Sequence, residues 1–151
     1  MKVGPAQSGG FCVVSGIVLS GIKAVKHKTW KVEVDPKSGV ILTVYVGTIT
    51  KQDALDSAQE ALRRATGRGP HLFLTDVLDA DSELTVFDIF DVPSHWEAIG
   101  SNRRSKLALL VPARGPMWED SRFYETVCRE EGWNVKVFSD KEEAIDWLTC
   151  R

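Results

Sequence analysis

Residues 134–148 read Asn-Val-Lys-Val-Phe-Ser-Asp-Lys-Glu-Glu-Ala-Ile-Asp-Trp-Leu, a short apolar strand followed at once by an amphipathic helix. The valines and the phenylalanine favour a strand over residues 135–138. Ser139 and Glu142 have the spacing of a capping box, which predicts a helix over about residues 140–149. Such a pair is the closing unit of a domain in which strands and helices alternate.

The same alternation extends upstream. Strands predicted at residues 30–34 and 40–46 flank a turn at residues 35–39, and they should pair as an antiparallel hairpin. A helix capped by Thr50 follows, and it stops at the glycines and proline of residues 67–70. Its predicted packing face is formed mainly by small residues: Ala54, Leu55, Ala58, Ala61, Leu62 and Ala65.

Two further strand–helix units complete the pattern, with strands at residues 72–75 and 106–111 and helices at residues 85–99 and 118–131. Pro93 falls inside one of these helices, so we expect a kink or a break into two short helices there. The order ββαβαβαβα predicts an α/β fold with a mixed, mostly parallel five-stranded sheet and right-handed crossovers.

Three segments together resemble a known family. Residues 39–50 form a strand, a glycine and a capped helix start, residues 72–76 form a strand that ends in aspartate, and residues 135–148 close the domain. In this order they resemble the STAS-domain family, in particular its SpoIIAA-like branch, which is related to anti-sigma-factor antagonists. The resemblance implies one domain at residues 29–151, with the strands of its sheet in chain order. Residues 1–28 are then expected to be an N-terminal extension, disordered or loosely packed.

The composition restricts the function. A formal net charge of −2, with 43% hydrophobic and 26% charged residues, lacks the basic character of a nucleic-acid-binding domain, so we expect no nucleic-acid partner. The three cysteines form no CxxC pair and no zinc spacing, which predicts a cytoplasmic protein without metal or cofactor. Residues 11–22 are too short and too rich in glycine and serine to span a membrane. A secretory signal or membrane anchor is the alternative for that segment.

An acidic loop is predicted at residues 76–83, and it contains Asp76, Asp79 and Asp81. In anti-sigma-factor antagonists a partner kinase phosphorylates a serine in this region, and Ser82 is the serine that the segment offers. Its acidic neighbours depart from the family's Asp-Ser-Ser-Gly context, so we expect Ser82 to be a helix cap or loop residue and not a phosphorylation site. A hard-cation site is the alternative use of these carboxylates, although their spacing is not that of an EF-hand.

The helix at residues 85–99 has more apolar surface than one helix face can bury, so part of it should line a pocket or a contact patch. Its packing face groups Val92 and Trp96, which leaves His95 at the surface. The candidate ligand or partner surface therefore combines acidic and aromatic residues: Asp76, Asp79, Asp81, Ser82, Phe87, Phe90 and Trp96.

The strand at residues 40–46 divides its side chains between the two faces of the sheet. One face receives Val40, Leu42, Val44 and Val46. The second face receives Ile41, Thr43 and Tyr45, and we assign to it also Phe73, Thr75, Leu110 and Phe138. If helices cover only one side of the sheet, this second face must be covered by the N-terminal extension, a partner or another subunit.

Two hypotheses of function follow. The first is a non-enzymatic STAS-like domain with a regulatory role that binds a protein partner or a small apolar ligand, a homodimer being one form of such a partner. The second is a small α/β enzyme that uses Asp76 or His95, although no P-loop, GxGxxG or GxSxG motif is present in the sequence. A closed apolar cavity beneath residues 84–99 would favour the binding of a ligand.

Overall fold

One β-sheet organises the protein. The structure is a computed structural model that describes residues 29–67 and 69–150, so the expectation for residues 1–28 lies outside the described part. Within it, five strands lie side by side in chain order, and the first two strands are antiparallel while the others are parallel. They are β1 (Trp30–Val34), β2 (Ile41–Ile49), β3 (Leu72–Ser82), β4 (Lys106–Leu110) and β5 (Asn134–Phe138). The predicted mixed, mostly parallel sheet is confirmed.

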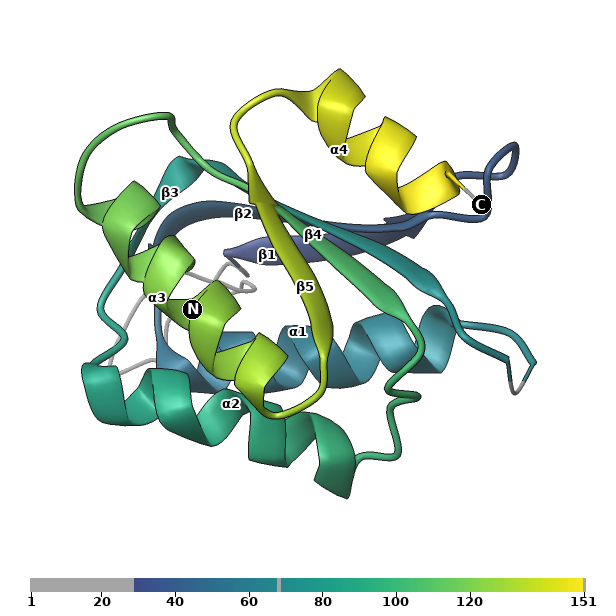
Figure 1. The fold of residues 1–151 in the computed structure, drawn as a ribbon, viewed down its shortest axis with the longest axis horizontal. Coiled ribbons are helices and arrows are strands. Elements are labelled where there is room, and N and C mark those ends of the chain that lie inside the picture. The colour runs from purple at the N-terminus through teal and green to yellow at the C-terminus, as the bar shows by residue number, and fades with distance from the viewer. Residues whose placement is uncertain (1–28, 68, 151) are drawn as a thin grey trace, which may run out of the picture.

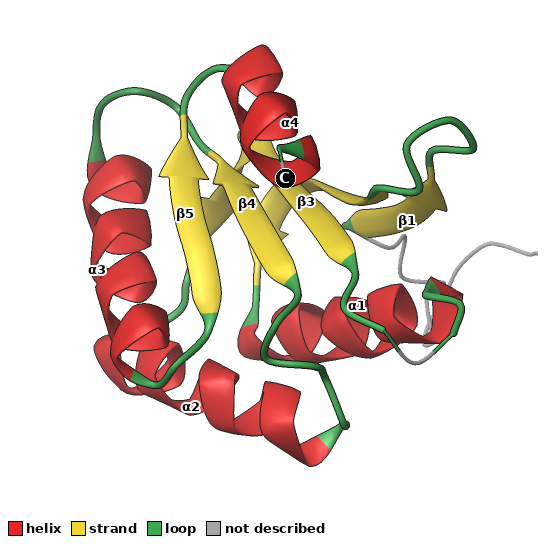
Figure 2. Cartoon of the chain, turned by 45° about the vertical axis from the view of Figure 1, so that its right-hand side comes forward, coloured by secondary structure: helices red, strands yellow, loops and turns green. Residues whose placement is uncertain are grey.

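Helices cover both faces of this sheet. They are α1 (Lys51–Arg64), α2 (Val86–Ala98), α3 (Pro116–Glu130) and α4 (Lys141–Thr149). Helices α1, α2 and α3 lie on one side, and α4 lies alone on the other side (Figure 1). Turning the molecule shows the same division, with α4 packed across β3, β4 and β5 (Figure 2). The second face assigned from the sequence is therefore covered by three helices of the chain itself.

The register of the strands decides which side chains share a face. Thr43 is paired with Thr75, Thr75 with Leu109, and Leu109 with Val137. Leu110 and Phe138 are each one residue further along, so they point to the opposite face. The assignment of these two residues to the face of Thr43 is therefore wrong. The sequence of one strand does not reveal its register with the neighbouring strands. They pack instead beneath α4 in one buried cluster: Val40, Leu74, Ala108, Leu110, Phe138, Ala144 and Leu148.

The acidic segment predicted as a loop is strand. After a bulge between Val44 and Val46, β2 continues to Ile49 and supplies backbone partners for β3 as far as Ser82. Asp79 and Asp81 are exposed in this extension, so their carboxylates remain solvated while the backbone is paired. The loop prediction was wrong because the local sequence does not reveal a partner strand of this length.

Capping side chains set the starts of three helices. Thr50 forms a capping box with Asp53 at α1, as predicted for the cap, and Thr85 forms another with Asp88 at α2. The expected capping role of Ser82 is therefore wrong, since Thr85 is better placed. At α4 the cap is Asp140 and not Ser139, because the carboxylate of Asp140 accepts the N–H of Glu142 at 3.3 Å.

Pro93 lies inside α2 without dividing it, so of the two expected alternatives, a kink or a break into two short helices, the break is wrong. Proline removes one backbone donor from a helix, and the remaining bonds of the turn keep the element continuous. The side chain of Pro93 is buried, as are those of Ile89 and Val92 on the same helix. Burial of this face against the rest of the domain offsets the lost hydrogen bond.

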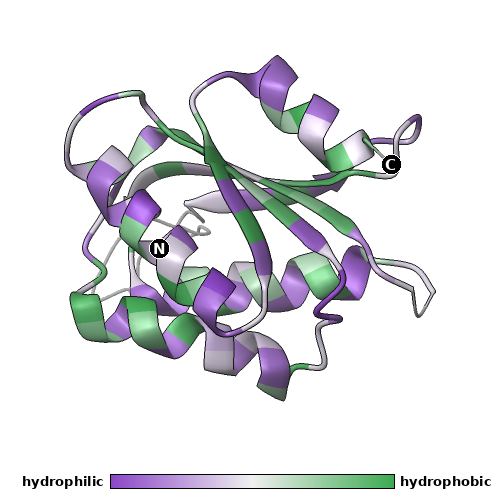
Figure 3. Ribbon diagram, viewed as in Figure 1, coloured by the Kyte–Doolittle hydropathy of each residue, from purple (hydrophilic) through white to green (hydrophobic). Residues whose placement is uncertain are grey.

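The outer side of α2 remains uncovered in the described residues. Phe87 is 81% exposed and Phe90 is 54% exposed, and the ring of Phe90 meets that of Phe123 on α3 at 5.5 Å between centroids. The first turn of α2 is coloured as hydrophobic in Figure 3. We call this surface the α2–α3 patch, and its members are Val86, Phe87, Phe90 and Phe123.

Candidate functional site

A cavity of about 180 Å³ lies between the sheet and helices α1, α2 and α3. Protein interiors contain few voids larger than a water molecule, so a space of this size is unusual. An apolar cavity of roughly 150 Å³ is large enough to bind benzene. Leu84, Ile89 and Val92 are among its lining residues, so the cavity lies beneath residues 84–99, and it is partly open to solvent and not closed.

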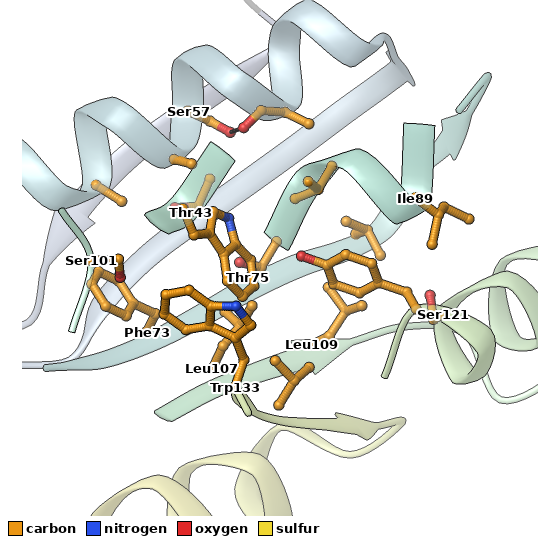
Figure 4. A pocket seen from close by; sticks show the side chains of 18 of the residues that line it. Thr43, Ser57, Phe73, Thr75, Ile89, Ser101, Leu107, Leu109, Ser121 and Trp133 are labelled. Carbon is orange, nitrogen blue, oxygen red and sulfur yellow. Dashed lines mark hydrogen bonds between the residues drawn. The ribbon is translucent and has the colours of Figure 1, made fainter. Parts of the chain in front are cut away.

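The floor of the cavity is formed by neighbouring strands in register. Thr43, Thr75 and Leu109 form one row across β2, β3 and β4, and Phe73 and Leu107 belong to the adjacent row. Figure 4 shows these side chains between the strands and the helices above them. Of these five side chains, the two threonines carry hydroxyl groups and the other three are apolar.

Helix α1 contributes small side chains where a larger residue would fill the space. The residues of α1 that line the cavity are Ala54, Ser57, Ala58, Ala61 and Leu62. They recur at helical spacing on one side of the helix, so they face the sheet together. The predicted small-residue face of α1 is therefore the roof of this part of the cavity.

Three aromatic rings form a wall. The ring of Trp96 on α2 meets Tyr124 on α3 at 6.0 Å and Trp133 at 5.3 Å, both nearly perpendicular. Edge-to-face contacts of this kind stabilise a fixed arrangement of the rings. Gly132, with φ of 91°, ends α3 and turns the chain into β5, which places Trp133 in the wall.

Two charged residues contribute to the lining of the cavity, Lys106 and Asp120, and Asp120 is exposed. Burial raises the pKa of Tyr45 to about 12 and the pKa of Tyr124 well above its usual value, so both phenols remain protonated at neutral pH. The hydroxyl of Tyr45 is hydrogen-bonded to that of Ser57. Lys106 contributes to the lining, but its Nζ donates to the carbonyl oxygens of Trp147 and Cys150 at 2.9 and 3.0 Å.

The fold of this chain is found among solved structures. A protein from Shewanella loihica PV-4, described as an uncharacterized protein from the DUF3478 family with a SpoIIAA-like fold, matches with a TM-score of 0.54 and 20% sequence identity, over 85% of this chain and 99% of that one. The chain has a SpoIIAA-like fold. The unphosphorylated anti-sigma factor antagonist SpoIIAA also matches, with a TM-score of 0.46 and 12% identity over 81% of this chain and 99% of that one. No family model and no curated protein matches the sequence.

This SpoIIAA-like domain separates the residues of the predicted surface into three places. Trp96 and Ser82 line the cavity, whereas Phe87 and Phe90 lie on the exposed α2–α3 patch. The three aspartates, Asp76, Asp79 and Asp81, lie on β3 and do not line the cavity. The predicted surface is therefore not one continuous site.

Asp76 and His95 are not brought together. Asp76 follows Thr75 on β3, so its side chain points to the face opposite the cavity, where it accepts the N–H of Leu78 at 3.0 Å. His95 lies on α2, on the cavity side of the sheet. It is half-buried and not at the surface as expected, and its Nε2 has no partner within the described residues.

Burial also raises the pKa of Cys128 to about 12, which keeps this thiol protonated.

Residues 29–67 and 69–150 contain neither a cluster suited to a metal ion nor a helix suited to a membrane. No group of three or more histidine, cysteine, aspartate or glutamate side chains in this part is placed to hold a metal ion. None of the helices described there is long and apolar enough to cross a membrane.

Sequence reasoning did not identify the parts that create the cavity. Thr43 and Thr75 were assigned to one face, but their contact with an internal space depends on the helices above them. Trp133 lies outside the predicted strands and helices, and its position in the wall depends on the turn at Gly132. The available signal was a pair of threonines at core-facing strand positions beneath a helix rich in alanine.

Proposed function

We propose that this protein is a non-enzymatic binding domain that holds a small, mainly apolar molecule between its sheet and helices α1, α2 and α3. The observation that carries this proposal is the cavity of about 180 Å³, because a well-packed domain would fill such a space with side chains. Binding of an apolar molecule there restores the dispersion contacts that a void lacks. Residues 29–151 are proposed as the binding unit.

The proposed role is regulatory, in that the ligand would change the stability or the surface of the domain. Helix α2 contributes both to the cavity, through Trp96, and to the exposed patch, through Phe87. A ligand beneath α2 can therefore influence a partner that contacts its outer side. Cys128 forms no disulfide within the described residues, which fits a reducing compartment, so we propose that the protein is cytoplasmic.

Native mass spectrometry of the full chain, purified from its own host, tests the proposal. We expect a small molecule to be retained, and we expect Ala58→Leu to lose it because the larger side chain fills the cavity from α1. Ala98→Leu is the matched control, since Ala98 is exposed on α2. Equal retention by both variants would place the molecule elsewhere, and absence of any small molecule from the wild-type protein would count against the proposal.

A second candidate function is the binding of a protein partner, including a second copy of the chain, through the α2–α3 patch. Its support is the exposure of two phenylalanines on one helix, a feature typical of contact surfaces. The same spectra record bound protein as well as bound small molecules. Phe87→Ser combined with Phe90→Ser should remove an associated protein and leave a ligand in the cavity.

A further inference from the structure

Two hydroxyl groups lie side by side on the cavity floor. Thr43 and Thr75 are direct neighbours in the parallel register of β2 and β3. Neighbouring strands are about 4.8 Å apart, so both hydroxyls can reach a single atom above them. Thr43 is only 6% exposed, and neither hydroxyl has a hydrogen-bond partner within residues 29–67 and 69–150. Both side chains are labelled among those around the cavity in Figure 4.

Apolar and aromatic side chains are among the neighbours of this threonine pair in the cavity lining. Phe73 and Leu107 occupy the adjacent row of the floor, and the rings of Trp96 and Trp133 stand beside them. Flat aromatic side chains favour a ring-shaped ligand, because rings in proteins prefer stacked or edge-to-face contacts. The volume of about 180 Å³ suits one ring with a short substituent.

The electrostatics of the cavity restrict the ligand further. The charged residues that contribute to the lining are Lys106 and Asp120. The ammonium group of Lys106 is held by two backbone carbonyls beneath α4, and Asp120 is exposed. An ionised ligand would therefore lose its hydration without gaining an opposite charge, which is strongly unfavourable.

We infer that the ligand is an uncharged single-ring compound with one hydroxyl or carbonyl oxygen, and that Thr43 and Thr75 bind this oxygen. The inference rests on the proposed function and adds the chemical class of the ligand. The hydroxyls of the two threonines can donate to a carbonyl oxygen, and they can also accept from a ligand hydroxyl. The ring then lies over Phe73 and Leu107, against the tryptophan wall.

Isothermal titration calorimetry of the full chain with three probes of similar size tests the inferred ligand class. Toluene is apolar, benzyl alcohol adds one hydroxyl, and benzoate adds a charge. We expect toluene and benzyl alcohol to bind, and benzoate to bind at least about tenfold more weakly than benzyl alcohol. In Thr43→Val and in Thr75→Val, the affinity for benzyl alcohol relative to toluene should fall by roughly two- to tenfold, the effect of one net hydrogen bond. Thr48→Val is the control, since Thr48 is exposed on β2.

The outcomes separate the two proposals. If both valine variants keep the wild-type ratio of the two affinities, or if benzoate binds as tightly as benzyl alcohol, the inferred ligand class is wrong while toluene binding still supports an apolar cavity. If none of the three probes binds, or if Ala58→Leu leaves toluene binding unchanged, the proposed function fails together with the inference.

Discussion

The indole rings of Trp96 and Trp133 meet edge to face with their centroids 5.3 Å apart, although one belongs to α2 and the other precedes β5. This contact connects the helix above the cavity to the sheet below it. The guanidinium of Arg103 also lies over the ring of Trp133, at 4.5 Å from its centroid. The wall of the cavity is thus also a structural link between α2 and the rest of the domain.

Trp96→Ala should therefore destabilise the protein as well as enlarge the cavity. We expect a loss of about 3 kcal/mol in the free energy of unfolding, the scale of a large aromatic residue removed from a packed contact. Chemical denaturation monitored by circular dichroism provides the measurement. Phe87→Ala on the same helix is the control, and because Phe87 is 81% exposed it should change the stability by less than about 0.5 kcal/mol. Similar losses for the two variants would contradict this account of the wall.

The buried phenol of Tyr45 makes stability depend on pH at the alkaline end. Burial raises its pKa to about 12 from the ordinary value of 10.0, so the folded state holds the proton more tightly than the unfolded state. The resulting stabilisation is complete below about pH 10 and is lost as the pH rises through about 12. Between about pH 9 and about pH 11 the wild-type protein should lose roughly 1 kcal/mol more than Tyr45→Phe. If the free energy of unfolding changes equally with pH in the two proteins, the folded-state pKa of Tyr45 is not raised and the prediction is wrong.

The order of the elements could be predicted because each one has a local signal. The alternation in β1, the capping residue Thr50 and the strand–helix junction near Asp140 are all readable within a few residues. The length of β3 could not be predicted in this way, since its second half is strand only because β2 extends alongside it to Ile49. Pairing across a sheet is a tertiary property, and it overrode the loop-like composition of the acidic segment.

The candidate site was harder to predict than the fold. A cavity forms where side chains from different elements are too small to contact one another. No single residue of the sequence indicates such a gap. Ala58 and Thr75 line the same space from different layers of the molecule, so their combined effect depends on how α1 sits on the sheet. The exposed aromatic residues of α2 were easier to predict. Phe87 and Val92 lie on different sides of the helix, so they cannot both face the core of the domain.

Leu148 should anchor α4 on the sheet. It is 2% exposed and belongs to the same buried cluster as Leu110 and Ala144. Leu148→Ala should cost roughly 2–5 kcal/mol of stability, measured by denaturant unfolding. Asp146→Ala is the matched control on the same helix, and because Asp146 is exposed its effect should remain below about 0.5 kcal/mol. A loss for Leu148→Ala no larger than that of the control would reject the packing of α4 on β3, β4 and β5.

Ser82 is predicted not to be a physiological phosphorylation site. It is the last residue of β3, it is half-buried against the cavity, and its hydroxyl accepts the N–H of Leu84 at 3.1 Å. A kinase needs the hydroxyl in an accessible segment, whereas here the backbone is paired with Ile49 of β2. A phosphate would also be placed between the carboxylates of Asp81 and Glu83, where like charges repel.

Phosphopeptide mapping of protein isolated from its host tests this directly, and we expect no stoichiometric phosphate on Ser82. Ser82→Ala should lower the stability by about 1 kcal/mol, because it removes one hydrogen bond at the end of β3. Thr85→Ala, which removes the N-cap of α2, should cost a similar amount and serves as the comparison. Stoichiometric phosphate on Ser82 would instead require β3 to release its last residues, and it would favour control of a protein partner by phosphorylation over the binding of a ligand in the cavity.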